Sequence, residues 1–507
     1  MLLIHPPQTK PAEPPAGIPL LAGALRNSGQ QCVICDLNIE GLHYLLDTST
    51  PAEDTWSKRA WKNRYNHLNT LRNCDTYLNL SRYTRAVTDL NKVVENAGKR
   101  SGIQLSLANY QDPALSPLKS DDLLASSSRF AENIYYPFFS KRLTQLIEAH
   151  TPTFIGFSLN YLSQALCTFA MVGFVRQVFP QIQIVLGGGL VTTWLQNKGQ
   201  LTQFEGLINH LVAGAGETQL LDIVEKTKLS RKDYQPDFTD LLEYNYTSPG
   251  FVLPYSSSTG CFWRKCSFCP ETSEGNPFKP IPVEEVRSEL ATLADKTQPK
   301  LIHLLDNAIS PAVLKSMTHQ PPIAPWYGFV RFSEHLADPD FCQALKRSGC
   351  ALLKIGLESG NQAVLDTMHK GIDLNLAHRA LTALRNASIA TYVYILFGTP
   401  GEAEEEARDT LHFVAAHHRS ISFLNLAIFN LPIGSAEIDD LDIHDFYEAD
   451  LSIYCDFEHP RGWNRKAIRH FLEGQFKREP RIKAILKRDP VHFTSNHAPF
   501  FSRQEVS

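Results

Sequence analysis

The sequence predicts an α/β protein with an N-terminal doubly wound parallel sheet, a partial (β/α) TIM barrel and a small C-terminal extension. Three observations lead to this prediction. The chain has 507 residues, too many for one ordinary hydrophobic core. Before residue 228, apolar strands that end in glycine loops alternate with helices. After residue 253, a strand followed by a helix recurs about every 30–50 residues, which is the rhythm of a (β/α) barrel.

The first domain is predicted at 1–228. Five short apolar runs read as its strands, and the runs between them have helical spacing. A largely helical insertion at about 45–145 interrupts the alternation. The expected strands are 1–4, 31–37, 154–158, 182–186 and 210–213.

A polar segment at 229–252, with several Pro and Tyr residues, is predicted to be a linker. The barrel is predicted at 253–433, and polar side chains follow the ends of its strands, where such barrels carry function. The regular pattern stops near 434, so 434–507 is predicted to be an irregular, aromatic- and Arg-rich extension. The expected barrel strands are 300–305, 325–332, 352–357, 390–397 and 421–429.

Composition narrows the class of protein. The net charge of -4 offers no electrostatic reason to expect a nucleic acid as partner. The N-terminus lacks the basic region and long apolar run of a signal peptide. The uncharged run 151–175 contains several polar residues and reads as strand, turn and helix, so no membrane span is predicted. Scattered, unclustered cysteines are typical of a reduced, cytoplasmic protein.

Three of the ten cysteines cluster in one loop. Cys261, Cys266 and Cys269 fall within nine positions, between Gly260 and Pro270. A short irregular loop can turn several thiolates toward one centre, so this spacing predicts a metal site. A structural zinc site is the alternative, but no fourth Cys or His stands at a matching spacing.

This loop, its place ahead of a βα repeat and the later GLESG and GTPGE turns resemble the radical S-adenosylmethionine (SAM) superfamily. The resemblance implies that Cys261, Cys266 and Cys269 hold three irons of a [4Fe-4S] cluster and that the fourth iron binds SAM. It further implies reductive cleavage of SAM to a 5′-deoxyadenosyl radical. The usual family spacing is C-x3-C-x2-C, whereas four residues separate Cys261 from Cys266 here.

The same resemblance implies SAM contacts at the strand ends. Glu358 and Ser359 are expected to bind the SAM ribose or ammonium, and Phe268 is the aromatic residue that precedes the last cysteine. Arg331 is expected to meet the SAM carboxylate or to fix Glu358. Asp306 occupies an equivalent strand end. For each of these the alternative is an ordinary ion pair at the barrel rim.

The first domain resembles the cobalamin-binding domain that precedes many radical SAM barrels. The family pattern D-x-H-x-x-G, S-x-L and G-G has its counterparts here, with Asn38 in place of the histidine that would ligate cobalt from below. A flavodoxin-like or Rossmann-like sheet that binds a nucleotide or nothing is the alternative. The residues expected to contact cobalamin are Asp36, Asn38, Ser158, Asn160, Gly187, Gly188, Gly189, Gly214 and Glu217.

Together these resemblances imply a cobalamin-dependent radical SAM enzyme, with methyl transfer to an unactivated carbon as the expected reaction. Cobalamin-assisted cyclisation or rearrangement is one alternative, and a non-catalytic metal- or cobalamin-binding protein is another. The expected partners are a small-molecule or peptide substrate and an electron donor such as flavodoxin or ferredoxin. A basic run at 461–488 is interpreted as solvated helix faces, with docking of an anionic partner as the alternative.

Overall fold

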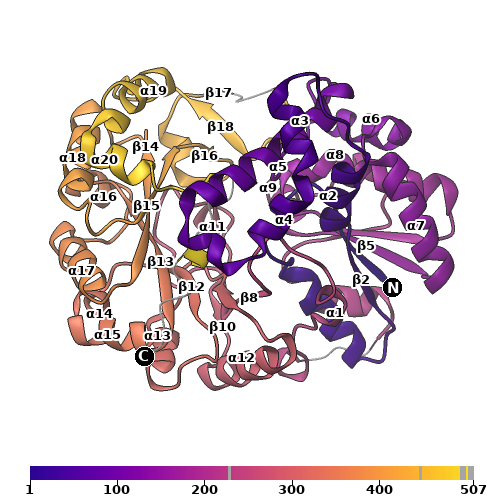
Figure 1. Cartoon of the computed structure of the whole chain (residues 1–507), viewed down its shortest axis with the longest axis horizontal. Coiled ribbons are helices and arrows are strands. Elements are labelled where there is room, and N and C mark those ends of the chain that lie inside the picture. Colours follow the sequence, from indigo (N-terminus) through magenta and orange to yellow (C-terminus); the bar gives the residue numbers. More distant parts are fainter. Residues whose placement is uncertain (227–229, 445–447, 492–497, 501–507) are drawn as a thin grey trace. The chain divides into compact units, whose positions relative to one another are not determined.

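The computed structural model describes residues 1–226, 230–444, 448–491 and 498–500. The chain divides into two compact units (Figure 1). The first comprises Met1–Phe251 and a short return at Glu448–Ile453, and the second begins at Val252 and includes Tyr454–Pro490. The segment 229–252, expected to be a linker, thus falls almost wholly within the first unit. Arg26 holds it there through ion pairs to Asp237 at 2.7 Å and to Asp240.

A five-stranded parallel sheet forms the centre of the first unit, in the order β2-β1-β5-β6-β7. The order reverses between β1 and β5, so the doubly wound fold is confirmed and this position is its topological switch point. Most residues of the strands are buried, as both faces of such a sheet are covered by helices. They are β1 (Leu2–His5), β2 (Val33–Asp36), β5 (Phe154–Ser158), β6 (Gln183–Gly187) and β7 (His210–Val212).

Helices follow these strands with little intervening chain, except that a longer loop separates β1 from α1. Asp36 ends β2 and caps α2 at once, because its carboxylate accepts from the backbone N–H groups of Asn38 and Ile39. α2 therefore follows β2 without an intervening loop. The helices beside the sheet are α1 (Gly17–Asn27), α2 (Leu37–Thr48), α8 (Leu162–Val178), α9 (Gly189–Lys198) and α10 (Glu217–Ile223).

The predicted insertion is indeed helical. Its longest helix, α5, has an amphipathic sequence whose apolar side chains Tyr83, Val87, Leu90 and Val94 are buried. A short antiparallel hairpin follows it, in which two-residue strands pair, β3 (Gln104–Leu105) with β4 (Tyr110–Gln111). The helices are α3 (Thr55–Lys62), α4 (Arg64–Leu71), α5 (Leu80–Arg100), α6 (Ser120–Ser128) and α7 (Tyr136–His150).

The second unit is built on six parallel strands that lie side by side in sequence order. The helices between them lie along the outer side of the sheet (Figure 1). Val252, Tyr327, Leu352, Tyr392 and Phe423 belong to one buried core cluster on the sheet. The strands are β8 (Val252–Tyr255), β11 (Leu301–Leu304), β12 (Trp326–Val330), β13 (Cys350–Glu358), β14 (Ala390–Phe397) and β15 (Phe423–Ile428).

This arrangement confirms the partial barrel. Each strand except the first and the last runs into its own short loop and helix. The strands are parallel, so their carboxyl ends gather at one edge. The covering helices include α12 (Val283–Thr297), α13 (Pro311–His319), α15 (Pro339–Arg347), α17 (Leu374–Asn386) and α18 (Glu404–Ala416).

The C-terminal extension is more regular than its sequence suggested. It contains α19 (Arg465–Gly474), α20 (Pro480–Leu486), β17 (Ile443–His444) and β18 (Tyr454–Phe457). β18 pairs with β17 and with β16 (Leu431–Pro432) in a small antiparallel sheet. Three arginines of the basic run bind barrel carbonyl oxygens instead of facing only solvent. Arg461 donates to Gly401 at 2.8 Å, Arg465 to Phe429 at 2.9 Å and Arg488 to Ile421 at 3.0 Å. These arginines fasten the extension to the strand ends and loops of the barrel.

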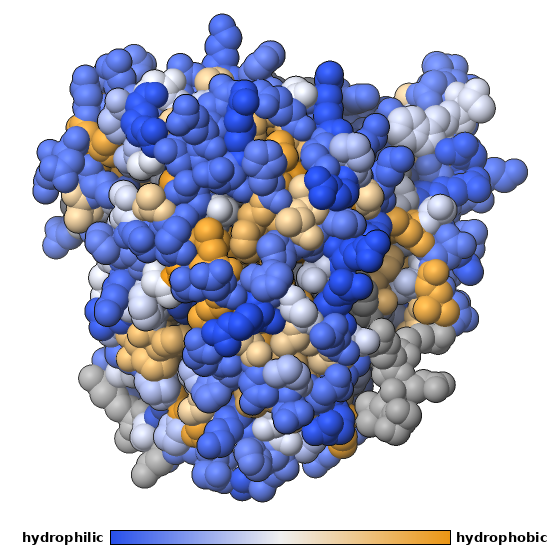
Figure 2. Space-filling view, turned by 90° about the vertical axis from the view of Figure 1, so that its left-hand side faces the viewer, coloured by the Kyte–Doolittle hydropathy of each residue, from blue (hydrophilic) through white to orange (hydrophobic). Residues whose placement is uncertain are grey.

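Within the part of the chain that the structure describes, no helix is both long and apolar enough to span a bilayer. Residues 151–175 divide into β5 and most of α8, as the sequence indicated. The face drawn in Figure 2 is mainly hydrophilic, with apolar residues scattered among the polar ones.

Candidate functional site

The cysteine loop begins at the end of the first barrel strand, and a buried carboxylate fixes its start. Asp306, just beyond β11, accepts hydrogen bonds from the backbone N–H of Ser257 at 3.1 Å and from the hydroxyls of Ser257 and Ser258 at 2.6 Å each. Gly260 has a φ of +70°, and a Cβ there would lie 2.5 Å from the carbonyl oxygen of Pro277. Asp306 therefore positions the loop, since its oxygens already have partners inside the protein.

All three loop cysteines are free thiols. Cys266 is buried, whereas Cys261 and Cys269 are half-buried. Burial raises the pKa of the Cys266 thiol, and the charges of Lys370 and Arg331 lower it. Burial also raises the pKa of the Cys269 thiol, against the backbone N–H groups of Glu271 and Thr272.

The donor set of the loop is three free thiols, Cys261, Cys266 and Cys269. Thiolates are the protein ligands of iron–sulfur clusters, and three of them can hold three irons of a [4Fe-4S] cluster while the fourth iron stays open. The chemistry of the donor set therefore suits such a cluster.

Arg331, directly after β12, lies beside the loop. Its Nη1 donates to the Sγ of Cys266 at 3.7 Å, and its Nη2 donates to the carbonyl oxygen of Lys370. Its guanidinium carbon lies 4.4 Å from the centre of the Trp263 ring. Arg331 thus contacts a predicted ligand directly, and it is not the partner of Glu358.

Lys370 is the residue that pairs with Glu358. Its Nζ lies 2.7 Å from Oε1 of Glu358, and their side chains are only 8% and 12% exposed. Glu358 adopts a left-handed conformation, with a φ of +67°. A Cβ on Gly356 would lie 2.2 Å from the same carboxylate oxygen, so only glycine leaves room for the pair. The pair presents a carboxylate at the end of β13 whose charge is balanced from within the protein.

A loop that the sequence reasoning missed completes the site. Residues 368–371 follow α16 (Gln362–Thr367), and three of their backbone carbonyls bind the cysteine loop or Arg331. Met368 accepts from the N–H of Ser267 at 3.1 Å, and His369 accepts from the indole N–H of Trp263 at 3.0 Å. The Lys370 ammonium also lies 5.4 Å from the centre of the Phe268 ring. Phe268 and Glu358 therefore meet the same lysine.

Ser359 lies apart from this group. Its hydroxyl contacts the Thr410 hydroxyl on α18 at 3.2 Å and accepts from the N–H of Asn361 at 3.1 Å. The residue is fully buried. Its side chain thus ties β13 to α18, and of the sequence-predicted barrel residues the structure gathers Phe268, Arg331 and Glu358 around the cysteines.

A cavity of about 240 Å³ lies within the second unit, where β14 and β15 end against the extension. Its lining includes Gly398, Asn430, His459 and Trp463. The buried Glu402 accepts from the N–H of Gly398 at 2.5 Å and from the indole N–H of Trp463 at 3.1 Å. Burial raises the pKa of Glu402 to about 7. This carboxyl therefore joins the GTPGE turn to the extension.

In the first unit, one set of predicted residues does come together. Asn160 donates from Nδ2 to the Ser158 hydroxyl at 3.0 Å, and its Oδ1 accepts from the N–H of Gly189 at 3.0 Å. Gly188 has a φ of +115°, and a Cβ there would lie 2.5 Å from the carbonyl oxygen of Leu159. Gly188 is thus required so that two protein loops can approach each other, at the half-buried ends of β5 and β6.

Gly214 extends this rim. Its N–H donates to the hydroxyl of Thr192 on α9 at 2.8 Å, and the space around its α-carbon is open. Glu217 stands at the start of α10 and is buried. The accessible edge therefore runs along the loops after β5, β6 and β7, from Ser158 to Gly214.

Asp36 and Asn38 lie in the interior instead. Asp36 accepts from the Tyr246 hydroxyl at 2.9 Å, and the Oδ1 of Asn38 accepts from the N–H of Thr9 at 2.9 Å. Both are at most 3% exposed. Their hydrogen bonds hold β2, α2 and the loop after β1 together, so the structure does not bring them to the rim.

The thiols of Cys32 and Cys35 are not placed for redox chemistry. Both are buried, and burial raises the pKa of Cys32 to about 11 and that of Cys35 to about 12. They are core thiols: Cys35 lies on β2, and Cys32 directly precedes this strand.

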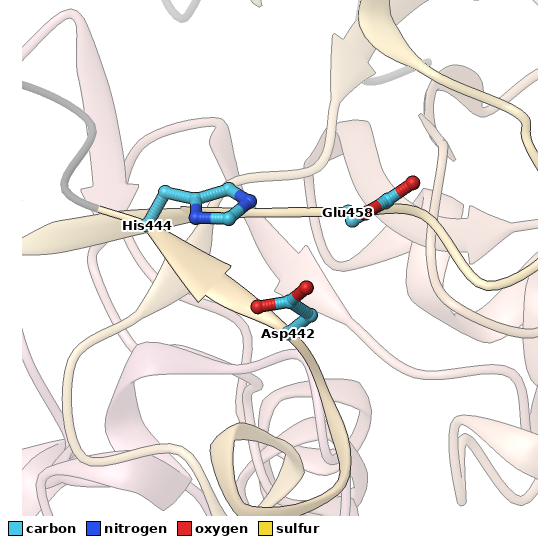
Figure 3. A group of neighbouring side chains, drawn as sticks. All are labelled: Asp442, His444 and Glu458. Atoms are coloured by element: carbon cyan, nitrogen blue, oxygen red, sulfur yellow. The ribbon is translucent and has the colours of Figure 1, made fainter.

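Three other side chains converge in the extension (Figure 3). Asp442 and His444 lie on one strand segment and Glu458 lies opposite, with one ligand atom from each within 4.8 Å of the others. The sequence reasoning missed this group. All three side chains are exposed. Exposed acidic groups are well solvated without an ion, so we assign the group no role.

Comparison with known proteins places this geometry in context. The family model of the radical SAM superfamily matches residues 323–414, a span that contains Arg331, Glu358 and Lys370. Bacteriochlorophyllide d C-12(1)-methyltransferase of Chlorobaculum tepidum is 24% identical over 252 residues, which cover 46% of this chain and 55% of the relative.

Solved structures share the fold over most of this chain. The cobalamin-dependent SAM radical enzyme OxsB, with aqua-cobalamin bound, matches with a TM-score of 0.50 and 12% identity, over 82% of this chain and 51% of that one. The radical SAM methyltransferase TsrM from Kitasatospora setae, with tryptophan and a SAM analogue bound, matches at 0.53 and 14% identity, over 90% and 85%. A TsrM structure with cobalamin and a [4Fe-4S] cluster matches at 0.50 and 16%, over 85% and 73%. The chain spans about half the length of the bacteriochlorophyllide methyltransferase and of OxsB.

Proposed function

We propose, from the premise that this chain belongs to the radical SAM superfamily, that it is a cobalamin-dependent enzyme that cleaves SAM reductively and transfers a methyl group to an unactivated carbon. One observation carries the proposal: four side chains lie together at the barrel strand ends, those of Cys266, Arg331, Lys370 and Glu358. These residues come from the cysteine loop and from the domain that the family model matches.

The cysteine loop supplies the ligands. Cys261, Cys266 and Cys269, all free thiols, would hold three irons of a [4Fe-4S] cluster. Such a cluster would supply the one electron that cleaves SAM into methionine and a 5′-deoxyadenosyl radical. The protein itself positions the cysteine loop. Asp306 does so by accepting hydrogen bonds from the hydroxyls of Ser257 and Ser258. The loop 368–371 does so by accepting a hydrogen bond from Trp263.

Glu358 is proposed to orient SAM. A carboxylate accepts hydrogen bonds from an ammonium group or from ribose hydroxyls, and it is strongest as an acceptor when ionised. The ammonium of Lys370 lies 2.7 Å from Oε1 of Glu358 and holds the carboxylate in place. Phe268, beside the same lysine, offers an apolar surface next to the carboxylate.

The first unit is proposed to bind cobalamin at the rim from Ser158 to Gly214. Ligands of doubly wound sheets bind at the carboxyl ends of the strands, near the switch point. The sheet order β2-β1-β5-β6-β7 and the half-exposed rim support this assignment. OxsB and TsrM, which share the fold, bind cobalamin. Asn38 is buried and hydrogen-bonded to Thr9, so it would give cobalt no lower ligand.

Methyl transfer is the favoured reaction because the bacteriochlorophyllide relative and TsrM are methyltransferases. OxsB is described as a SAM radical enzyme and not as a methyltransferase, which keeps cyclisation or rearrangement as a second candidate. The proposed partners are a small-molecule or peptide substrate and a one-electron donor such as flavodoxin or ferredoxin.

Anaerobic reconstitution of the full chain tests the proposal. We expect about four irons per chain, the EPR signal of a reduced [4Fe-4S] cluster and 5′-deoxyadenosine from SAM. Cys266→Ala is expected to abolish the product, whereas Cys74→Ala, a half-buried thiol in the first unit, is expected to leave it unchanged. Full product formation by Cys266→Ala would refute the ligand assignment.

The two candidate reactions separate in a second experiment. With methyl-labelled SAM, methyl transfer places the label in the organic product, whereas cyclisation or rearrangement leaves it in methionine. Label found only in methionine, together with a new unlabelled product, would exclude the methyl transfer proposed here.

A further inference from the structure

Arg331 is fixed at three points beside the cysteine loop. One guanidinium nitrogen donates to the Cys266 sulfur at 3.7 Å, and another donates to the carbonyl oxygen of Lys370. The guanidinium face lies 4.4 Å above the Trp263 ring. Because all three partners belong to the protein, this position does not depend on a bound ligand.

Trp263 is itself held in place, and it belongs to the four residues that separate Cys261 from Cys266. Its indole N–H donates to His369 at 3.0 Å. Its ring occupies the space above Gly371, where a Cβ would lie 2.0 Å from a ring carbon. The longer loop therefore provides an aromatic surface on which the arginine rests.

A cation that donates to a cluster thiolate has a known physical effect. The hydrogen bond withdraws electron density from the sulfur, and the positive charge stabilises the extra electron of the reduced cluster. Both effects raise the reduction potential. The low local dielectric around the buried Cys266 strengthens them.

We propose that Arg331, seated on Trp263, sets the reduction potential of the cluster through its hydrogen bond to Cys266. Arg331 is a positioning residue in this role, because it acts through the thiolate. The inference rests on the proposed function, since it assumes that a [4Fe-4S] cluster occupies the loop. It differs from the expectation that Arg331 binds the SAM carboxylate.

The test is a redox titration of the reconstituted full-length protein without SAM, followed by the EPR signal of the reduced cluster. We expect Arg331→Met and Arg331→Gln to make reduction at least tenfold less favourable, which is about 59 mV for one electron. Arg331→Lys is expected to fall between these variants and the unchanged protein, because it keeps the charge and loses the planar fork.

Lys265→Met is the matched control. Lys265 is exposed, and its ammonium lies 5.0 Å from the centre of the same Trp263 ring. The variant removes one positive charge beside Trp263, as the Arg331 variants do, and leaves the hydrogen bond from Arg331 to Cys266 in place. We expect its reduction equilibrium to change less than threefold. An equal shift in Lys265→Met and Arg331→Met would overturn the inference, because a general charge effect would then explain both.

Two further outcomes are decisive. An unshifted potential in Arg331→Gln combined with a tenfold loss of SAM affinity would assign Arg331 to the SAM carboxylate and refute the inference. If the Arg331 variants fail to hold a cluster, Trp263→Leu removes the support of the arginine and is expected to lower the potential in the same direction. If the unchanged protein binds no [4Fe-4S] cluster, the proposed function itself fails, and this result is distinct from a normal cluster with an unshifted potential.

Discussion

At the scale of single residues, the site depends on a buried ion pair that local sequence does not reveal. Glu358 follows a strand and is recognisable as a rim carboxylate, but Lys370 lies twelve positions further on, beyond α16. Only the folded chain brings their charged groups to 2.7 Å. The same holds for Trp263 and Gly371, whose contact comes from two separate loops.

Lys370→Met is expected to impair the site strongly. Removing one partner of a buried pair leaves an uncompensated charge, which costs roughly 3–5 kcal/mol of stability. We expect a lower unfolding temperature and at least tenfold weaker SAM binding, measured by calorimetry on the reconstituted protein. Arg379→Met breaks an exposed pair to Glu334 in the same barrel and is expected to cost at most about 1 kcal/mol. Equal losses in the two variants would contradict this account.

Glu402 gives the second unit a pH-dependent stability. Its pKa is raised to about 7 in the folded protein, so the folded state binds this proton more tightly than the unfolded state does. The stabilisation is complete below about pH 4.5 and is lost as the pH rises toward 7, by about 3 kcal/mol in all. Asp489, whose pKa burial also raises to about 7, acts in the same direction.

Glu402→Gln is therefore expected to weaken the pH dependence of unfolding. An amide keeps an acceptor for Gly398 and Trp463 but has no proton to lose between pH 4.5 and 7. The measurement compares the shift in unfolding temperature between pH 5 and pH 7.5 for the unchanged protein and the variant. Asp489→Asn serves as a comparison. A shift of the same size in the unchanged protein and in Glu402→Gln would show that this carboxyl does not titrate in the range.

At the scale of elements, the side chains of the candidate site lie on or beside short loops, and the regular strands and helices hold these loops in place. Gly371 has a φ of +65° and lies against the Trp263 ring, while Gly275, beyond the cysteine loop, has a φ of +66° with open space around it. The two glycines share a backbone conformation and differ only in what a side chain would meet. They form a natural pair for an experiment.

Gly371→Ala is expected to displace Trp263 and to reduce the iron content after reconstitution by at least half. Gly275→Ala pays only the cost of a left-handed conformation, about 1–2 kcal/mol, and is expected to keep its iron. Iron and sulfide analysis of the two purified variants makes the comparison. Normal iron in Gly371→Ala would mean that Trp263 is not needed to shape the loop.

The elements also indicate what sequence alone can predict. Buried strands and their following helices were predictable because apolar runs and glycine turns recur regularly, and the fold class and the radical SAM resemblance are confirmed. The extension was predicted to be irregular, although Ile468, Phe471 and Leu472 of α19 already have helical spacing. The many Arg and aromatic residues of the extension made this helical spacing hard to recognise. The sequence motif around Asp36 and Asn38 could not reveal that both are buried.

At the scale of the whole molecule, the two proposed cofactors should respond to different substitutions. Gly188→Val inserts a side chain where a Cβ would lie 2.5 Å from a backbone oxygen, so it should distort the rim of the first unit. We expect at least tenfold weaker cobalamin binding with unchanged iron content. Cys266→Ser should lower the iron content and leave cobalamin binding unchanged. Iron analysis and the cobalamin absorbance after gel filtration measure the two contents in each variant.

Gly199→Val is the control for the first of these variants. Gly199 ends α9 with a φ of +72° and has open space around it. It should therefore retain cobalamin at nearly the unchanged affinity. Loss of both cofactors in either Gly188→Val or Cys266→Ser would show that the two sites are coupled through folding and are not independent.

The return of the chain at Glu448–Ile453 has a consequence for the order of synthesis. The indole N–H of Trp194 donates to the carbonyl of Leu451, and the N–H of Leu451 donates to Leu118. The N–H of Ser120 donates to the carboxylate of Asp450. When residue 251 leaves the ribosome, Asp450 and Leu451 have not yet been made, so these three hydrogen bonds are missing. The two residues follow about 200 positions later, roughly 10–40 s at ordinary elongation rates. The first half of the nascent chain must therefore wait, incomplete, until most of the second half has been made.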